Sequence, residues 1–125
     1  MPDRSPVLER YFEALRTHGW ESLAGCLSDD VHRTGPYLDV VRGKQAYVEF
    51  LAGVVPSLPN YELRVSRIRE LEGGSALVEL SEILDVDGVR TEFPEALVFD
   101  FAPDGRIQRV DIFIKQLPSR RKEGA

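Results

Sequence analysis

Residues 75–101 read SALVELSEILDVDGVRTEFPEALVFDF, and this stretch decides the fold. The even-numbered positions from Ala76 to Val86 are mostly apolar, and beyond Asp87-Gly88 the odd-numbered positions from Phe93 to Phe101 are mostly apolar too. Alternation with a period of two is typical of a strand with one buried face. Asp-Gly favours a two-residue hairpin turn. The stretch therefore predicts a β-hairpin whose two apolar sets share one side of a sheet.

Two glutamates interrupt this apolar face. With the turn at Asp87-Gly88, Glu82 lies opposite Phe93 and Glu95 lies opposite Leu80, so the glutamates are diagonal neighbours with backbones about 7–8 Å apart. A carboxylate is rare on an apolar face unless it is paired, protonated or functional. Two interpretations stay open. Either the glutamates bend into water or meet an arginine, or they form a pair of cavity carboxylates with raised pKa values that serve as acid, base or ligand anchor.

The flanking segments predict helices on one side of a longer sheet. Apolar residues at helical spacing follow Ser5-Pro6, which offers an N-cap and a first-turn proline, and that helix ends near Gly19. Further helices are expected at 20–27 and 44–54. A short strand is expected at 31–34, a loop at 36–42, and long strands at 61–71 and 106–115, the former with a bulge near Ser66-Arg67.

The order of these elements predicts an α+β fold. Three N-terminal helices would pack on a curved antiparallel four-stranded meander, with one additional short strand. We expect a single domain over residues 1–125, with a flexible tail at about 116–125. If Phe101 faces Arg106 in the last hairpin, then Ile112 lies across from Glu95 and Asp111 points outward.

A twisted sheet that curls around its helices would enclose a hollow. Small-molecule sites are typically apolar hollows with a few placed polar groups. His32 and Arg33 point to opposite faces of the short strand, and the sequence leaves open which of them faces inward. The expected lining residues share the inner faces of these elements: Tyr11, Leu15, Phe50, Leu80, Glu82, Phe93, Glu95, Leu97, Val110 and Ile112.

The opposite face of the sheet is also apolar, because it carries Leu77, Ile83, Val98 and Phe113. An exposed apolar face of this kind favours an interface with another molecule. A homodimer formed through this face is the simplest expectation.

Composition excludes several classes of function. The net charge of −5 argues against a nucleic-acid partner, and the basic cluster at 120–122 fits a solubilising tail. The single cysteine, Cys26, falls in an apolar helical pattern and fits a core thiol in a reducing compartment. Neither a signal peptide nor an apolar run of membrane-spanning length is present, so we expect a cytoplasmic protein with no membrane partner. Two histidines without a clustered ligand set give no metal signature.

Three segments of the chain are VLERYFEALRTHGWESLAGCLSDDVHRTGP, VVRGKQAYVEFL and FAPDGRIQRVDIFI. They resemble the nuclear-transport-factor-2-like superfamily, which includes ketosteroid isomerase and SnoaL-like polyketide cyclases, and the resemblance extends from about Pro6 to Lys115. It implies a cone-shaped α+β barrel, an internal hydrophobic pocket and commonly a dimer. Because this scaffold hosts many chemistries, the resemblance indicates the fold more strongly than the function.

The ketosteroid isomerase pattern survives only in part. Its oxyanion-hole tyrosine matches Tyr11, whereas its general-base aspartate falls on Gly35 and its second oxyanion-hole residue falls on Leu97. Glu95 could replace the missing acid and Glu82 the missing base. The acid-base aspartate of the SnoaL-type cyclases has no secure match in this chain.

These observations lead to one principal hypothesis. The protein is expected to be an isomerase, cyclase or hydrolase that acts on an apolar, polyketide- or steroid-like molecule without a metal or organic cofactor. Glu82 and Glu95 would move protons and Tyr11 would stabilise an oxyanion. The alternative is a protein without catalysis, either a binder of an apolar ligand or a dimeric accessory domain. The sequence does not decide between an enzyme and a non-enzyme.

Overall fold

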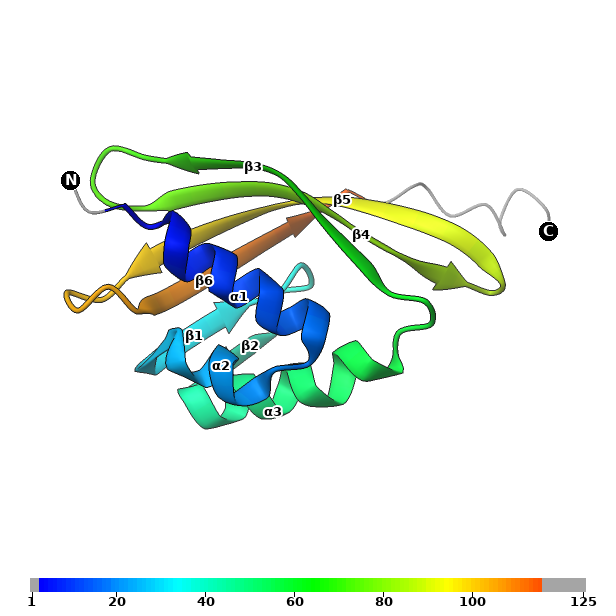
Figure 1. Cartoon of the computed structure of the whole chain (residues 1–125), viewed down its shortest axis with the longest axis horizontal. Coiled ribbons are helices and arrows are strands. Elements are labelled where there is room, and N and C mark those ends of the chain that lie inside the picture. The colour runs from blue at the N-terminus through cyan, green and yellow to red at the C-terminus, as the bar shows by residue number, and fades with distance from the viewer. Residues whose placement is uncertain (1–2, 116–125) are drawn as a thin grey trace.

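The computed structural model of the chain describes residues 3–115, which form helices and strands in the order expected for an α+β protein (Figure 1). The predicted tail at 116–125 and its basic cluster lie outside the described residues. The elements are α1 (Ser5–Thr17), α2 (Trp20–Gly25), β1 (Leu27–Thr34), β2 (Val40–Arg42), α3 (Lys44–Val54), a 3-10 turn η1 (Val55–Ser57), β3 (Glu62–Glu70), β4 (Ala76–Val86), β5 (Val89–Phe101) and β6 (Ile107–Ile114).

The strands form one sheet of six, in the order β2-β1-β6-β5-β4-β3. β1 runs parallel to β6, and every other neighbouring pair is antiparallel. The expectation of a four-stranded meander plus one short strand was therefore incomplete. Residues 36–42, expected to form a loop, contain β2, whose three residues are too few and too exposed to show a burial pattern. β1 begins at Leu27 instead of Val31, because the chain is already extended over residues 28–30.

The central hairpin has the predicted register. Val86 pairs with Val89, Glu82 with Phe93, and Leu80 with Glu95. The predicted bulge in β3 is confirmed by a register shift between Val65 and Arg67. The register predicted for the last hairpin was wrong by two residues. Phe101 pairs with Ile107 instead of Arg106, and an irregularity at Asp100/Phe101 adds one more residue of shift. Ile112 therefore lies opposite Leu97 and Ile114 opposite Glu95, which keeps the inner face but moves each side chain along it.

The helices differ from the prediction only at their ends. The N-cap of α1 is Arg4, not Ser5, and Ser5 donates its backbone N–H to the carboxylate of Asp3. The helix ends where His18 adopts a left-handed conformation. α2 stops at Gly25 because Leu27 joins the sheet, whereas α3 has the predicted bounds.

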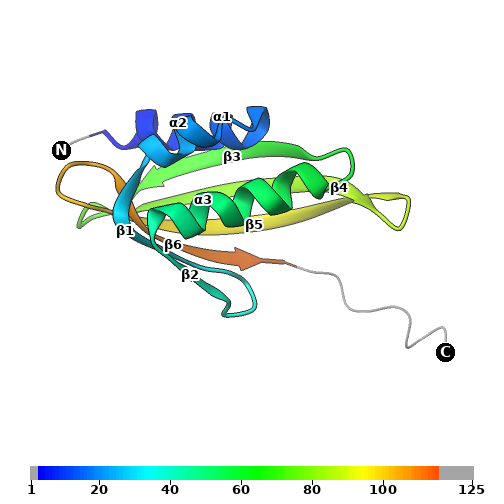
Figure 2. The same cartoon turned by 90° about the horizontal axis from the view of Figure 1, so that it is seen from below.

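The helices gather on one face of the sheet, with α1 beside β3 and α3 over β1 and β2 (Figures 1 and 2). The core lies between these two layers. Tyr11, Phe12 and Phe99 pack edge to face at its centre, an arrangement that aromatic rings favour. Cys26 is a buried free thiol, as predicted. Within residues 3–115, no helix is long and apolar enough to cross a membrane.

Candidate functional site

A small cavity opens between the helices and the inner face of the sheet. Its volume is about 60 Å³, well below the several hundred Å³ typical of a small-molecule site. Its lining is mainly apolar but includes the two carboxyl groups singled out in the hairpin. The lining residues are Tyr11, Phe12, Leu15, Arg33, Leu51, Val55, Leu63, Leu80, Glu82, Glu95, Leu97, Ile112 and Ile114.

Glu95 is the most deeply buried acid of this cavity. Its residue is 8% exposed, and its Oε2 atom has no hydrogen-bond donor among the described residues. Burial raises the pKa of Glu95 to about 10, and the hydrogen bond and negative charge of Glu82 act in the same direction, whereas the positive charge of Arg33 opposes them. Glu95 is therefore a neutral carboxylic acid at pH 7. In that form it can donate the proton that its neighbour accepts.

Glu82 has a different environment although it lies one strand away on the same face. Its Oε2 accepts a hydrogen bond of 2.5 Å from the hydroxyl of Tyr61. Burial and the negative charge of Glu82 strongly raise the pKa of Tyr61, so this hydroxyl remains a donor. Glu82 thus has one fixed donor, and the neutral acid of Glu95 supplies a second. Two adjacent carboxyl groups with different proton occupancy are suited to acid-base chemistry.

Tyr11 reaches the cavity from α1, as its helical position predicted. Its hydroxyl lies 2.6 Å from that of Tyr47 on α3, and both tyrosines are buried. Burial raises the pKa of Tyr11 to about 12. A hydroxyl that accepts from Tyr47 keeps its own proton available, so Tyr11 can donate to an oxygen in the cavity.

Arg33, not His32, faces the cavity. The guanidinium of Arg33 lies 4.9 Å from the ring centre of Phe50, which is close to the cavity but does not line it. His32 occupies the alternate position on β1, opposite Arg42 on one side and Arg109 on the other, and is absent from the lining. Sequence alternation established that the two point in opposite directions, and packing against α3 determines which points inward.

The remaining predicted lining residues divide into two groups. Leu15, Leu80, Leu97 and Ile112 line the cavity. Val110 is fully buried in the core and Phe93 is half-buried towards the hairpin tip, so neither lines it. Sequence reasoning did not assign Tyr61 to the site. The available signal was its alternation with Leu63, two residues further along, which lines the cavity; Tyr61 itself contacts Glu82 and is not part of the lining.

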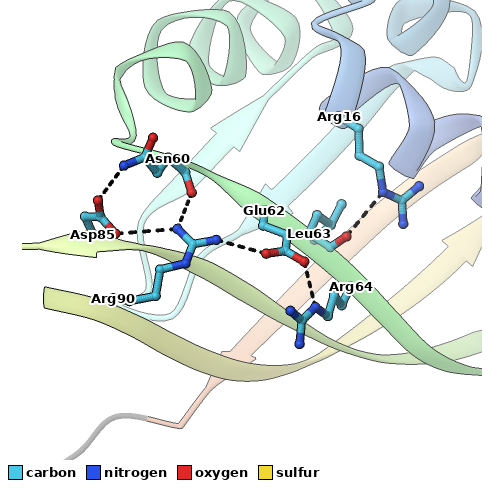
Figure 3. Close-up of polar contacts among 7 residues, drawn as sticks. All are labelled: Arg16, Asn60, Glu62, Leu63, Arg64, Asp85 and Arg90. Atoms are coloured by element: carbon cyan, nitrogen blue, oxygen red, sulfur yellow. Dashed lines mark hydrogen bonds and ion pairs between the residues drawn. The ribbon is translucent and has the colours of Figure 1, made fainter.

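A network of polar contacts holds the backbone on both sides of Tyr61 (Figure 3). Arg90, from the start of β5, donates to the carbonyl oxygen of Asn60 at 2.5 Å and to the Glu62 carboxylate at 2.9 Å, and it lies 3.5 Å from Asp85. The Asn60 amide in turn donates to Asp85. The tip of the hairpin is thereby tied to the segment that carries Tyr61, which positions the tyrosine hydroxyl on Glu82.

Two further features bear on metals and on the outer face. The described part of the chain holds no group of three or more His, Cys, Asp or Glu side chains arranged for a metal ion. A larger hollow of about 360 Å³ lies on the outer face of the sheet, lined in part by Ser81, Pro94, Ala96 and Phe113. Leu80, Glu95 and Ile114, which line the small cavity, also line this hollow, so the hollow reaches the strands that carry the acid pair.

Comparison with known proteins gives a consistent family. The chain matches the SnoaL-like domain over residues 8–110. Among curated proteins, none matches. A ketosteroid-isomerase-like protein from Kribbella flavida is 25% identical with a TM-score of 0.74, and the match covers 95% of this chain and 85% of that one.

Two enzymes share the fold at lower identity. A LEH-like epoxide hydrolase from M. tuberculosis is 21% identical with a TM-score of 0.75, covering 90% of this chain and 82% of that one. SalBIII, an epoxide hydrolase/cyclase-like enzyme with a role in pyran ring formation in salinomycin, is 18% identical with a TM-score of 0.75, covering 90% and 91%. Since the domain match spans well over half of the sequence, this chain belongs to the SnoaL-like family.

Proposed function

We propose that this protein is an acid-base enzyme that opens an epoxide or a similar strained ether, as a hydrolase or a cyclase. The observation that carries the proposal is the neutral acid Glu95 beside Glu82, whose oxygen is held by Tyr61. Opening an epoxide requires a proton donor for the leaving oxygen and a base for the attacking hydroxyl. The pair supplies both from side chains of the chain itself, so the step requires neither a metal nor an organic cofactor.

The proton balance of the reaction follows from these roles. Glu82 accepts a proton from water, or from a hydroxyl of the substrate, as the oxygen of that group attacks carbon. The carbon–oxygen bond of the epoxide breaks, and the released oxygen takes the proton of Glu95. Transfer of one proton from Glu82 to Glu95 then restores the starting state. Tyr11 would donate a hydrogen bond to the oxygen that develops negative charge.

Steroid isomerisation is a less suitable reaction for this site. The positions expected to hold the base and the second oxyanion donor are Gly35 and Leu97, and neither can exchange a proton. Asp111 is not available either, since it lies off the cavity and pairs with Arg109. The folds of the M. tuberculosis epoxide hydrolase and of SalBIII are compatible with the epoxide assignment.

The cavity limits how the substrate enters. At about 60 Å³ it holds the reacting end of a molecule and not a whole polyketide or steroid. We propose that the apolar remainder of the substrate lies at the mouth of the cavity or widens it on binding.

The test is turnover of a panel of small epoxides by the wild type and by Glu82→Gln and Glu95→Gln. Each substitution should lower kcat by about 10²-fold or more, while Glu92→Gln, an exposed glutamate on the same strand as Glu95, leaves it unchanged. An epoxide hydrolysed equally well by both cavity variants would refute the assignment. The assignment would also be refuted if NMR titration gave both cavity glutamates a pKa of about 4.3, the value of an unperturbed glutamate.

A second candidate is a protein without catalysis whose hollow is filled by its own side chains, or one that only binds an apolar ligand. The small volume of the cavity favours it. A melting screen against apolar compounds discriminates these cases, because a ligand bound to the native state must raise Tm. No shift for any compound would support the accessory domain.

We also propose that the protein is a homodimer that pairs through the outer face of the sheet. Phe113 is 60% exposed there and borders the outer hollow, whereas Ile83, expected to be exposed on this face, is only 5% exposed. Phe113→Glu should convert a dimer to a monomer in analytical ultracentrifugation. A wild type that sediments as a monomer would refute the pairing.

The lone buried thiol supports a cytoplasmic location.

A further inference from the structure

Arg33 is the charged group of the cavity that the acid-base mechanism leaves unused. It is the one basic residue among the described residues that line the cavity. Its side chain is 13% exposed and lies over the ring of Phe50. Burying a guanidinium without strong partners is unfavourable, so a position of this kind requires an explanation beyond packing.

The hydrogen-bonding capacity of this guanidinium is incompletely used. Its Nη1 is buried and has no hydrogen-bond acceptor in the described structure. The nearest carboxylate is that of Asp39, whose Oδ2 lies 3.6 Å from Nη1, too far for a hydrogen bond, and whose side chain is 47% exposed. Asp39 therefore offsets part of the positive charge of Arg33 from the solvent side. The Nη1 of Arg33 remains a buried donor without an acceptor among the described residues.

The position of the Asp39 carboxylate depends on Gly35, which has no side chain. A Cβ added to Gly35 would lie 2.4 Å from Oδ1 of Asp39, so the carboxylate occupies the space that a larger residue would fill. The absence of a side chain at Gly35 therefore leaves the space in which the Asp39 carboxylate lies beside Arg33. The Asp39 carboxylate on the solvent side and the Phe50 ring thus support the guanidinium of Arg33, in an orientation that is set before any ligand binds.

The charges already present decide which oxygen this donor suits. Arg33 is positive, Glu82 supplies one negative charge within the same cavity, and Glu95 is neutral. Tyr11 from α1, Tyr47 from α3 and Tyr61 from before β3 add only neutral hydroxyls. An anionic ligand would introduce a second negative charge beside Glu82 in a dry space, where like charges repel strongly. A neutral acceptor oxygen satisfies the donor without that cost.

We propose that Arg33 is a substrate-binding residue that donates a hydrogen bond to a neutral carbonyl oxygen, so that the substrate carries a carbonyl group in addition to its epoxide. This inference rests on the proposed function for the presence of a substrate, but it adds the chemical class. The substrate would carry a ketone, ester or lactone carbonyl near its reacting carbon–oxygen bond. Arg33 would hold the carbonyl while Glu95 and Glu82 act on the epoxide.

The test measures binding of three small probes of similar shape by NMR titration. They are cyclohexanone, methylenecyclohexane, which replaces the oxygen by CH₂, and cyclohexanecarboxylate, which adds a charge. Cyclohexanone should bind at least tenfold more tightly than either of the other two. Equal binding of methylenecyclohexane, or tighter binding of the carboxylate, would overturn the inference.

Substitutions assign the effect to Arg33. Arg33→Met keeps a long side chain over Phe50 and should weaken cyclohexanone binding by tenfold or more while binding of methylenecyclohexane is unchanged. Arg42→Met, an exposed arginine on the adjacent β2, should change neither. If Arg33→Met does not fold, the test is the side-chain N–H resonance of Arg33 in the wild type, which must shift when cyclohexanone is added. A resonance that does not move would refute the contact.

These experiments test the role of Arg33 separately from the proposed epoxide reaction. Cyclohexanone binding that depends on Arg33, in a protein inactive on every epoxide, would refute only the epoxide reaction. Epoxide turnover in a protein whose ketone affinity is the same in Arg33→Met would refute only the role of Arg33.

Discussion

Replacing Glu95 by glutamine should stabilise the protein at neutral pH, although the same change should lower kcat by about 10²-fold or more. The native state holds Glu95 as a neutral acid because burial and Glu82 raise its pKa above the ordinary value of 4.5. The unfolded chain releases this proton once the pH exceeds that value. The folded state therefore binds more protons than the unfolded state, and its stability falls as the pH rises from 4.5 towards the native pKa. A buried carboxyl of this kind gives a slope opposite to that of a salt-bridged one.

The magnitude follows from the width of this pH window. One pH unit corresponds to about 1.4 kcal/mol for one proton, so between pH 4.5 and pH 7 the wild type loses at most about 3 kcal/mol through Glu95. Glutamine has nearly the same shape, is neutral at every pH, and can donate its amide N–H to Glu82. The variant should therefore be more stable than the wild type by up to about 3 kcal/mol at pH 7, and by close to zero near pH 4.

The assay is urea unfolding at pH values from 4 to 8, with the wild type, Glu95→Gln and Glu92→Gln measured in parallel. The plots of unfolding free energy against pH for the wild type and Glu95→Gln should diverge steadily above pH 4.5. The plots for the wild type and the exposed control Glu92→Gln should remain parallel. Curves that stay parallel for Glu95→Gln would refute the neutral acid. A variant less stable than the wild type at pH 7 would show that Glu95 is ionised and paired in the native state.

Three further substitutions probe the supports of the site. Gly35→Ala should cost about 1–3 kcal/mol in urea unfolding, because its Cβ would overlap the carboxylate of Asp39, whereas Gly53→Ala in α3 meets no atom within 4 Å and should be neutral or stabilising by about 0.5–1 kcal/mol. Equal effects would contradict the close approach. Arg90→Ala should speed amide exchange at the hairpin tip and in the segment before β3 at a cost of about 1 kcal/mol, since its contacts are half-exposed; unchanged exchange would exclude the proposed tie. Tyr61→Phe should cost about 1.5–3 kcal/mol at pH 7, because it removes a part-buried hydrogen bond to a carboxylate, and a loss below ~0.5 kcal/mol would mean that water replaces the hydroxyl.

Local sequence patterns sufficed for the part of the molecule that matters most to the chemistry. The alternation in β4 and β5 and the two-residue turn between them determine the hairpin register, because a slip of one residue would turn the whole apolar set to the wrong face. The same register places Glu82 and Glu95 diagonally on the inner face, and helical spacing places Tyr11 over them. These relations involve residues close in the chain or fixed by one turn, so they need no knowledge of distant contacts.

Tertiary structure decided what depends on distant contacts. β2 is a strand only because β1 lies beside it. In β6, the pairing of Phe101 with Ile107 and the irregularity at Asp100/Phe101 each shift the register by one residue. The inward direction of Arg33 is set by Phe50 and Asp39, and the donor on Glu82 comes from Tyr61, 21 residues earlier in the chain. The volume left between helices and sheet is the sum of many side-chain packings, and no periodic pattern records it. The chain alone thus determined that two acids share an apolar face, while packing decided that one is neutral, the other is held by a phenol, and an arginine faces them.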